Sequence, residues 1–107
     1  MVFIETPIFT KLIQSLLSDD ELKQLQAYLI ECPAAGDLLK GGGGLRKLRW
    51  ARQGTGKSGG IRTIYYWANK DEQIFFVFAY PKAKTEALTS EQLVQLAKVV
   101  KEEFGNG

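Results

Sequence analysis

The sequence predicts an α+β domain in which the elements follow the order β-α-α-β-β-β-α. A β-prone run and two capped amphipathic stretches open the chain, three β-prone runs occupy its middle, and a capped amphipathic stretch closes it. With 107 residues, of which 45% are hydrophobic, the chain is large enough to fold around one core without disulfides. We therefore expect a single domain spanning residues 1–107.

The first third of the chain predicts one short strand and two helices. Residues 2–4 are β-prone, and Thr6 followed by Pro7 is typical of a helix N-cap and its first turn. Ser18, with Glu21 three residues later, forms a capping box that opens a second helix. The side chains expected to face the core are Ile8, Phe9, Leu12, Ile13 and Leu16 in the first helix, and Leu22, Leu25 and Leu29 in the second.

The middle of the chain predicts a hairpin and an interior strand. Residues 34–44 end in four glycines and are expected to be a loop. Residues 45–52 and 61–68 are β-like, and the glycine-rich segment 53–60 joins them. Residues 73–80 are apolar at odd and even positions alike, which indicates a strand covered on both faces.

A last helix is predicted between a capping box and a glycine. Thr89 and Gln92 have the spacing of the box, and Gly105 is a typical C-terminal stop. The residues expected to face inward are Leu93, Leu96, Ala97, Val100 and Phe104.

The composition limits the kinds of catalytic chemistry and the cellular compartment that we expect for this chain. Cys32 is the only cysteine, so no internal disulfide can form, and we expect a buried thiol in a reduced, cytoplasmic protein. No apolar run approaches the roughly twenty residues that span a bilayer, so no membrane association is expected. The chain has no histidine, which removes the usual triad base, proton shuttle and metal ligand. We predict no metal site and no cofactor.

Positive charge is concentrated in the middle of the chain. Residues 38–70 carry eight Lys or Arg and no acidic residue, whereas residues 1–37 have a net charge of −4 and residues 71–107 of −2. Such a band attracts polyanions, of which nucleic acid is the commonest in a cell. The alternative is a solvated basic face without a partner. The eight residues are Lys40, Arg46, Lys47, Arg49, Arg52, Lys57, Arg62 and Lys70.

Strand alternation divides these basic residues between two faces. Arg46 and Arg52 share one face of their strand, and Lys47 and Arg49 share the other. Arg62 lies among β-branched and aromatic residues, where a guanidinium without a partner is costly. Its partner is either a carboxylate of the same chain or a bound anion, and alternation alone does not separate the two. Aromatic side chains could also stack on unpaired bases, and we favour Tyr66 and Tyr80 for that role.

Three segments give the chain a resemblance to a known family. They are Gly43-Gly44-Leu45-Arg46-Lys47-Leu48-Arg49-Trp50, Gly59-Gly60-Ile61-Arg62-Thr63-Ile64-Tyr65-Tyr66, and Phe78-Ala79-Tyr80-Pro81-Lys82-Ala83-Lys84, followed by Leu88-Thr89 at the last helix. Over nearly its full length the chain resembles the RelE/HigB group of bacterial toxin–antitoxin toxins. The resemblance implies a small antiparallel sheet with two N-terminal helices packed on one face and a C-terminal helix. It also implies an open face that binds messenger RNA in the ribosomal decoding site.

The resemblance further implies an activity and a partner. The activity is ribosome-dependent cleavage of translated mRNA, which inhibits translation and growth. The partner is a cognate antitoxin, which in the HigB branch often has a helix-turn-helix DNA-binding domain like that of HigA. Some relatives have a catalytic tyrosine near the C-terminus, and this chain has Thr85-Glu86-Ala87-Leu88 after Lys84 instead.

Residue by residue, the resemblance assigns the chemistry to basic side chains. Arg62 matches the mid-sheet arginine of the family, Lys47 and Arg49 match its basic strand positions, and Lys82 or Lys84 matches its basic residue after the last strand. We hypothesise that the RNA 2′-hydroxyl attacks the adjacent phosphate, with Lys47 or Lys82 as base or acid and Arg49 and Arg62 as phosphate clamps. The further residues expected to contact RNA are Arg46, Arg52, Lys57, Tyr66, Tyr80 and Lys84.

Two other functions fit the same basic band. A non-catalytic module could dock on RNA or the ribosome, in which case it would produce no cuts at defined codon positions. A protein-interaction domain could receive an acidic partner on this face, in which case it would bind a protein without RNA.

Overall fold

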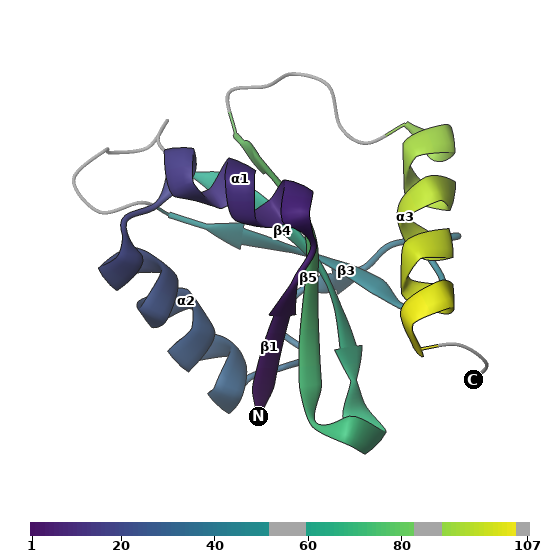
Figure 1. The fold of residues 1–107 in the computed structure, drawn as a ribbon, viewed down its shortest axis with the longest axis horizontal. Coiled ribbons are helices and arrows are strands. Elements are labelled where there is room, and N and C mark those ends of the chain that lie inside the picture. The colour runs from purple at the N-terminus through teal and green to yellow at the C-terminus, as the bar shows by residue number, and fades with distance from the viewer. Residues whose placement is uncertain (52–59, 83–88, 105–107) are drawn as a thin grey trace.

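The computed structural model describes residues 1–51, 60–82 and 89–104, and it has the predicted α+β class and element order (Figure 1). A two-residue strand, β2, and a short 3₁₀ turn at Asn69–Asp71 add to the predicted elements. The elements are β1 (Val2–Glu5), α1 (Pro7–Leu16), α2 (Asp19–Glu31), β2 (Asp37–Leu38), β3 (Leu45–Trp50), β4 (Ile61–Ala68), β5 (Gln73–Pro81) and α3 (Ser90–Phe104).

The helices begin where their capping residues predict. The Thr6 hydroxyl accepts a hydrogen bond from the Phe9 N–H at 3.0 Å, which opens α1 at Pro7. Ser18 and Glu21 form the full capping box of α2. Thr89 and Gln92 exchange the same pair of bonds ahead of α3. These bonds satisfy N–H groups that a helix end leaves without partners, so the local sequence alone sets all three starts.

The five strands form one mixed sheet in the order β1-β5-β4-β3-β2. β1 runs parallel to β5, and the other neighbouring pairs are antiparallel. The hairpin of β3 and β4 is confirmed, and β5 is an interior strand, as its apolar sequence predicts. β2 lies within residues 34–44, which we predicted to be a loop, because Asp37 and Leu38 pair with the edge of β3.

Each face of the sheet has its own apolar cluster. On one face α1 and α2 cover the strands, with Phe9, Leu25 and Leu29 packed against Tyr65 and Phe76. The two N-terminal helices therefore share one face, as predicted. On the other face α3 covers the strands, with Val100 packed among Leu45, Ile64, Phe75 and Val77. Figure 1 shows α1 and α2 on one side of the strands and α3 on the other.

Two expectations about single residues are wrong. Ile8 was expected to face the core but is 50% exposed, because Phe9 and Ile13 are the residues of α1 that turn toward the sheet. Cys32 was expected to be buried but is exposed, because it is the C-cap of α2 and lies beyond the packed part of that helix. No helix within the described ranges is both long enough and apolar enough to span a bilayer.

Candidate functional site

Strand register brings two arginines and a tyrosine into one row. Arg49 of β3 pairs directly with Arg62 of β4, and Arg62 pairs with Tyr80 of β5. Residues that pair directly across antiparallel strands project from the same face of the sheet. The row therefore lies on the α3 face, where Arg49 is exposed and Arg62 is half-buried.

The Arg49–Arg62 pair is electrostatically unfavourable by itself. Like charges directly opposite each other on neighbouring strands destabilise a sheet. Within the described residues, neither guanidinium forms an ion pair with a carboxylate, and the Arg62 side chain donates a hydrogen bond to the adjacent Ile61 carbonyl at 3.3 Å. A bound anion would offset the repulsion between the two groups.

Lys82 adds a third cation next to Arg62. Its backbone N–H donates to the Gly60 carbonyl at 2.8 Å, which continues the pairing of β4 and β5 beyond Ile61 and Pro81. A Cβ atom at Gly60 would lie 3.8 Å from Lys82 Cδ and 3.9 Å from Arg62 Nη1. Both side chains therefore lie close to Gly60, as does the Trp50 carbonyl oxygen, which would be 3.2 Å from the same Cβ.

Lys47 completes a group that we call the basic cluster, consisting of Lys47, Arg49, Arg62 and Lys82. Lys47 lies two residues before Arg49 on β3, pairs with Ile64 and is half-buried. It consequently projects from the same face as Arg49, two residue pairs closer to Leu45, which packs under α3. The four cations come from β3, from β4 and from the residue just after β5, and Lys and Arg side chains grouped in this way can contact phosphate oxygens.

Tyr80 forms one side of the basic cluster. Its ring is 9% exposed and packs against Phe78 with ring centroids 6.0 Å apart. Burial raises the pKa of Tyr80 above its ordinary value of 10.0, and the nearby Arg62 charge opposes that rise. Its hydroxyl is therefore protonated at neutral pH and can donate a hydrogen bond, but it is a poor base there.

Arg46 and Tyr66, which are expected to contact RNA, both have structural partners within the fold. Arg46 projects from the α1–α2 face, and its guanidinium donates to the carbonyls of Ala34 at 3.2 Å and Gly36 at 2.9 Å. Tyr66 is half-buried in the apolar cluster under α3 and pairs with Leu45. A Cβ atom at Gly44 would lie only 2.8 Å from the Tyr66 ring, and Gly44 has a φ of +99°. Arg46 thus lies on the face opposite the basic cluster, whereas Tyr66 lies on the same face, two residue pairs along from Lys47, and the contact of either residue with RNA stays a prediction.

Three predicted RNA contacts, Arg52, Lys57 and Lys84, lie outside the described residues. The sequence interpretation also missed one position of the site, which is Gly60. The signal for it was the Gly59-Gly60 pair directly before a strand, because glycine at a strand end often marks a place where another group approaches the backbone.

The whole chain was compared with models of known protein families. A family model described as "RelE toxin of RelE / RelB toxin-antitoxin system" matches residues 2–105. The match includes all five strands and all three helices described above, from β1 to the last residue of α3.

Proposed function

This chain belongs to the RelE toxin family, and we propose that it cuts translated mRNA on the ribosome with the basic cluster as its active site. One observation carries the proposal. Arg49 and Arg62 face each other on neighbouring strands without a carboxylate among the described residues, and RNA phosphate is the anion that such a pair suits.

The proposed reaction needs no metal and no histidine. The 2′-oxygen of one nucleotide attacks the adjacent phosphorus and transfers its proton to a base, while the bond from phosphorus to the 5′-oxygen breaks. That leaving oxygen takes a proton from an acid. The products are a 2′,3′-cyclic phosphate and a 5′-hydroxyl. The protein must therefore hold the phosphate, stabilise the charge that develops on it and move two protons.

The basic cluster can supply these functions. Arg49 and Arg62 are proposed to clamp the phosphate oxygens, because guanidinium groups bind phosphate in a bidentate geometry. Lys47 and Lys82 are proposed as the proton-transfer groups, with the order between them open. Tyr80 would donate a hydrogen bond next to Arg62, since its raised pKa makes it a poor base at neutral pH.

The partners and the compartment follow from the same proposal. Family membership implies a RelB-type antitoxin, and we keep as a prediction that this antitoxin has a HigA-like helix-turn-helix domain. The substrate is mRNA bound in the ribosome, so the toxin would act in the cytoplasm.

Replacing Arg62 with alanine tests the proposal. Removing one positioned charge from such a site typically costs about 2.7–4 kcal/mol, or roughly a hundredfold to a thousandfold in rate. Primer extension on translated messages should show defined cuts with the unaltered toxin and almost none with Arg62→Ala. Lys70→Ala is the matched control, because Lys70 is exposed in the turn that follows β4, at the opposite end of the strand from Arg62.

The same experiment separates the catalytic function from its alternative. Near-full cleavage by Arg62→Ala would show that the basic cluster is not the active site. Ribosome binding without defined cuts by the unaltered chain would instead favour a non-catalytic module that docks on RNA.

A further inference from the structure

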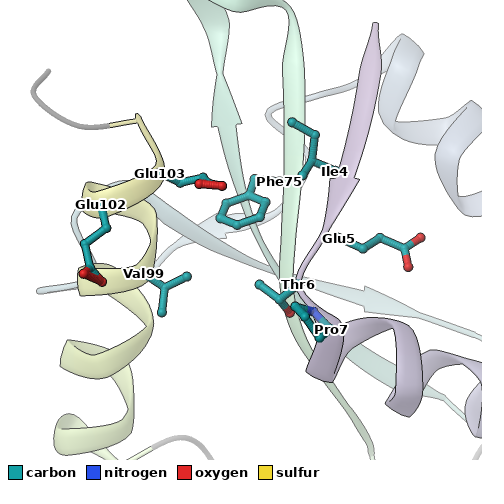
Figure 2. A pocket seen from close by; sticks show the side chains of 8 residues that line it. All are labelled: Ile4, Glu5, Thr6, Pro7, Phe75, Val99, Glu102 and Glu103. Atoms are coloured by element: carbon teal, nitrogen blue, oxygen red, sulfur yellow. The ribbon is translucent and has the colours of Figure 1, made fainter.

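A groove lies on the α3 face between α3 and the junction of β1 with α1. It is a cavity of about 320 Å³ lined by Ile4, Glu5, Thr6, Pro7, Phe75, Val99, Glu102 and Glu103. Figure 2 shows the Phe75 ring of β5 as its floor, the last turns of α3 as one wall, and Thr6 and Pro7 on the opposite side. None of its lining residues belongs to the basic cluster.

The apolar part of the groove is accessible from solvent along α3. Val99 is 38% exposed on that wall, although it is a β-branched apolar side chain. Val99 and Glu103 are four residues apart, so they lie on the same face of the helix. A segment entering the groove would therefore contact an apolar and an acidic side chain together.

The lining is acidic, in contrast with the basic cluster. Three of the lining residues are glutamates and none is Lys or Arg. The Glu5 carboxylate accepts a hydrogen bond from the Thr10 hydroxyl at 2.6 Å, whereas Glu102 and Glu103 are exposed. Both exposed glutamates lie in the last turn of α3, where the partial negative charge of a helix C-terminus disfavours carboxylates, and Lys101 of the same turn does not line the groove. A cation brought by a partner would relieve this concentration of negative charge.

We infer that this groove is a docking site for a segment of the antitoxin that carries an apolar side chain next to a Lys or Arg. The inference rests on the toxin role in the proposed function, but not on mRNA cleavage being its reaction. Charge complementarity favours a basic protein segment over RNA, because an acidic wall repels a polyanion, and the antitoxin is the protein partner that family membership implies. The groove is thus separate from the surface that receives the polyanion.

The acidic wall is tested by Glu103→Lys. Charges at the rim of an interface act mainly on the association rate, so the rate of binding to the purified cognate antitoxin should fall about tenfold and depend less on salt. The substitution should strengthen the end of α3, because a lysine there suits the helix dipole, and weaker binding would not reflect a melted helix. Glu31→Lys makes the same change in the last turn of α2 and should leave the association rate unchanged.

The apolar wall is tested by Val99→Gln, which keeps good helix propensity and adds no charge. Loss of an apolar contact acts mainly on dissociation, so the antitoxin should dissociate about tenfold faster. Val94→Gln is the matched control, because Val94 is 48% exposed on α3 but does not line the groove.

Binding is measured without RNA, and mRNA cleavage by each variant is measured without antitoxin. Weaker antitoxin binding with unchanged cleavage by Glu103→Lys and Val99→Gln would support the inference. Unchanged binding, or an equal loss in the control variants, would overturn it. A self-associating toxin whose dimer is lost in Glu103→Lys would also overturn it, because the groove would then receive a second copy. Loss of cleavage in Arg62→Ala bears on the proposed function alone.

Discussion

Two arginine–tyrosine pairs lie on opposite faces of the same sheet and differ in how their polar groups are satisfied. On the α1–α2 face Arg46 pairs with Tyr65 across β3 and β4. The Tyr65 hydroxyl donates to the Pro33 carbonyl at 2.8 Å and accepts from the Gly36 N–H at 2.9 Å. Arg46 donates to two carbonyls of the same segment. The backbone after α2 therefore satisfies this pair.

On the α3 face Arg62 pairs with Tyr80 across β4 and β5. Arg62 faces a second arginine, Arg49, and no carboxylate among the described residues forms an ion pair with it. The two pairs use the same residue types in the same cross-strand arrangement. The comparison indicates that residue type does not decide the role of an arginine here. What decides it is whether the chain itself supplies acceptors on that face.

The largest expected effect comes from Arg49→Glu, which reverses one charge of the Arg49–Arg62 pair. The new carboxylate would face Arg62, so the free energy of unfolding should rise by about 0.2–1 kcal/mol as repulsion becomes attraction. Cleavage of translated mRNA should fall at least a hundredfold, or about 2.7 kcal/mol, because a phosphate clamp is lost. Urea unfolding and primer extension measure the two quantities. A variant that is both stable and active would contradict the assigned role of Arg49.

A smaller effect, of opposite sign on the free energy of unfolding, is expected from Arg46→Ala in the Arg46–Tyr65 pair. Hydrogen bonds from a charged donor contribute about 1.5–3 kcal/mol, and the lower end applies because Arg46 is only half-buried. The free energy of unfolding should fall by about 1.5 kcal/mol, measured in urea. The cleavage rate per folded molecule should stay within about twofold of the unaltered toxin, since the guanidinium lies on the far face. A hundredfold loss of cleavage would place Arg46 among the RNA contacts after all.

The smallest effect is expected from Tyr80→Phe. Loss of one neutral hydrogen bond costs about 0.5–1.5 kcal/mol, so cleavage should fall about tenfold or less. Because burial raises the pKa of Tyr80, the folded chain keeps this proton above pH 10.0, where the unfolded chain loses it. Tyr80 therefore makes stability decline as pH rises through the alkaline range, and it contributes no pH dependence below about pH 9.

Urea unfolding across the alkaline range checks this sign. Tyr80→Phe should remove part of the alkaline decline in stability, and Tyr65 should retain its own part, because burial raises its pKa too. An alkaline decline that is as steep in Tyr80→Phe as in the unaltered chain would show that Tyr80 titrates normally in the folded state.

Local patterns in the sequence were enough to predict the three α-helices and four of the five strands. The two capping boxes and the single N-cap bond act within four residues, so Thr6, Ser18 and Thr89 identify the helix starts without knowledge of the fold. The wrong expectations concern residues whose local sequence pattern does not determine what surrounds them in the fold. Ile8 has the helical spacing of a core residue and β2 has only two residues, and their surroundings depend on which distant segments pack nearby.

The sequence by itself determined the element order, the helix caps and the segregation of Lys47 and Arg49 from Arg46, because capping and strand alternation are local properties of the chain. Only the tertiary structure decided that Arg49 faces Arg62, that Lys82 reaches the same space above Gly60, and that Arg46 is satisfied by the backbone after α2. The physical reason is that register and helix packing join residues far apart in the chain. Side-chain alternation places consecutive residues of a strand on opposite faces of the sheet, but it does not determine which face a helix or a loop will cover.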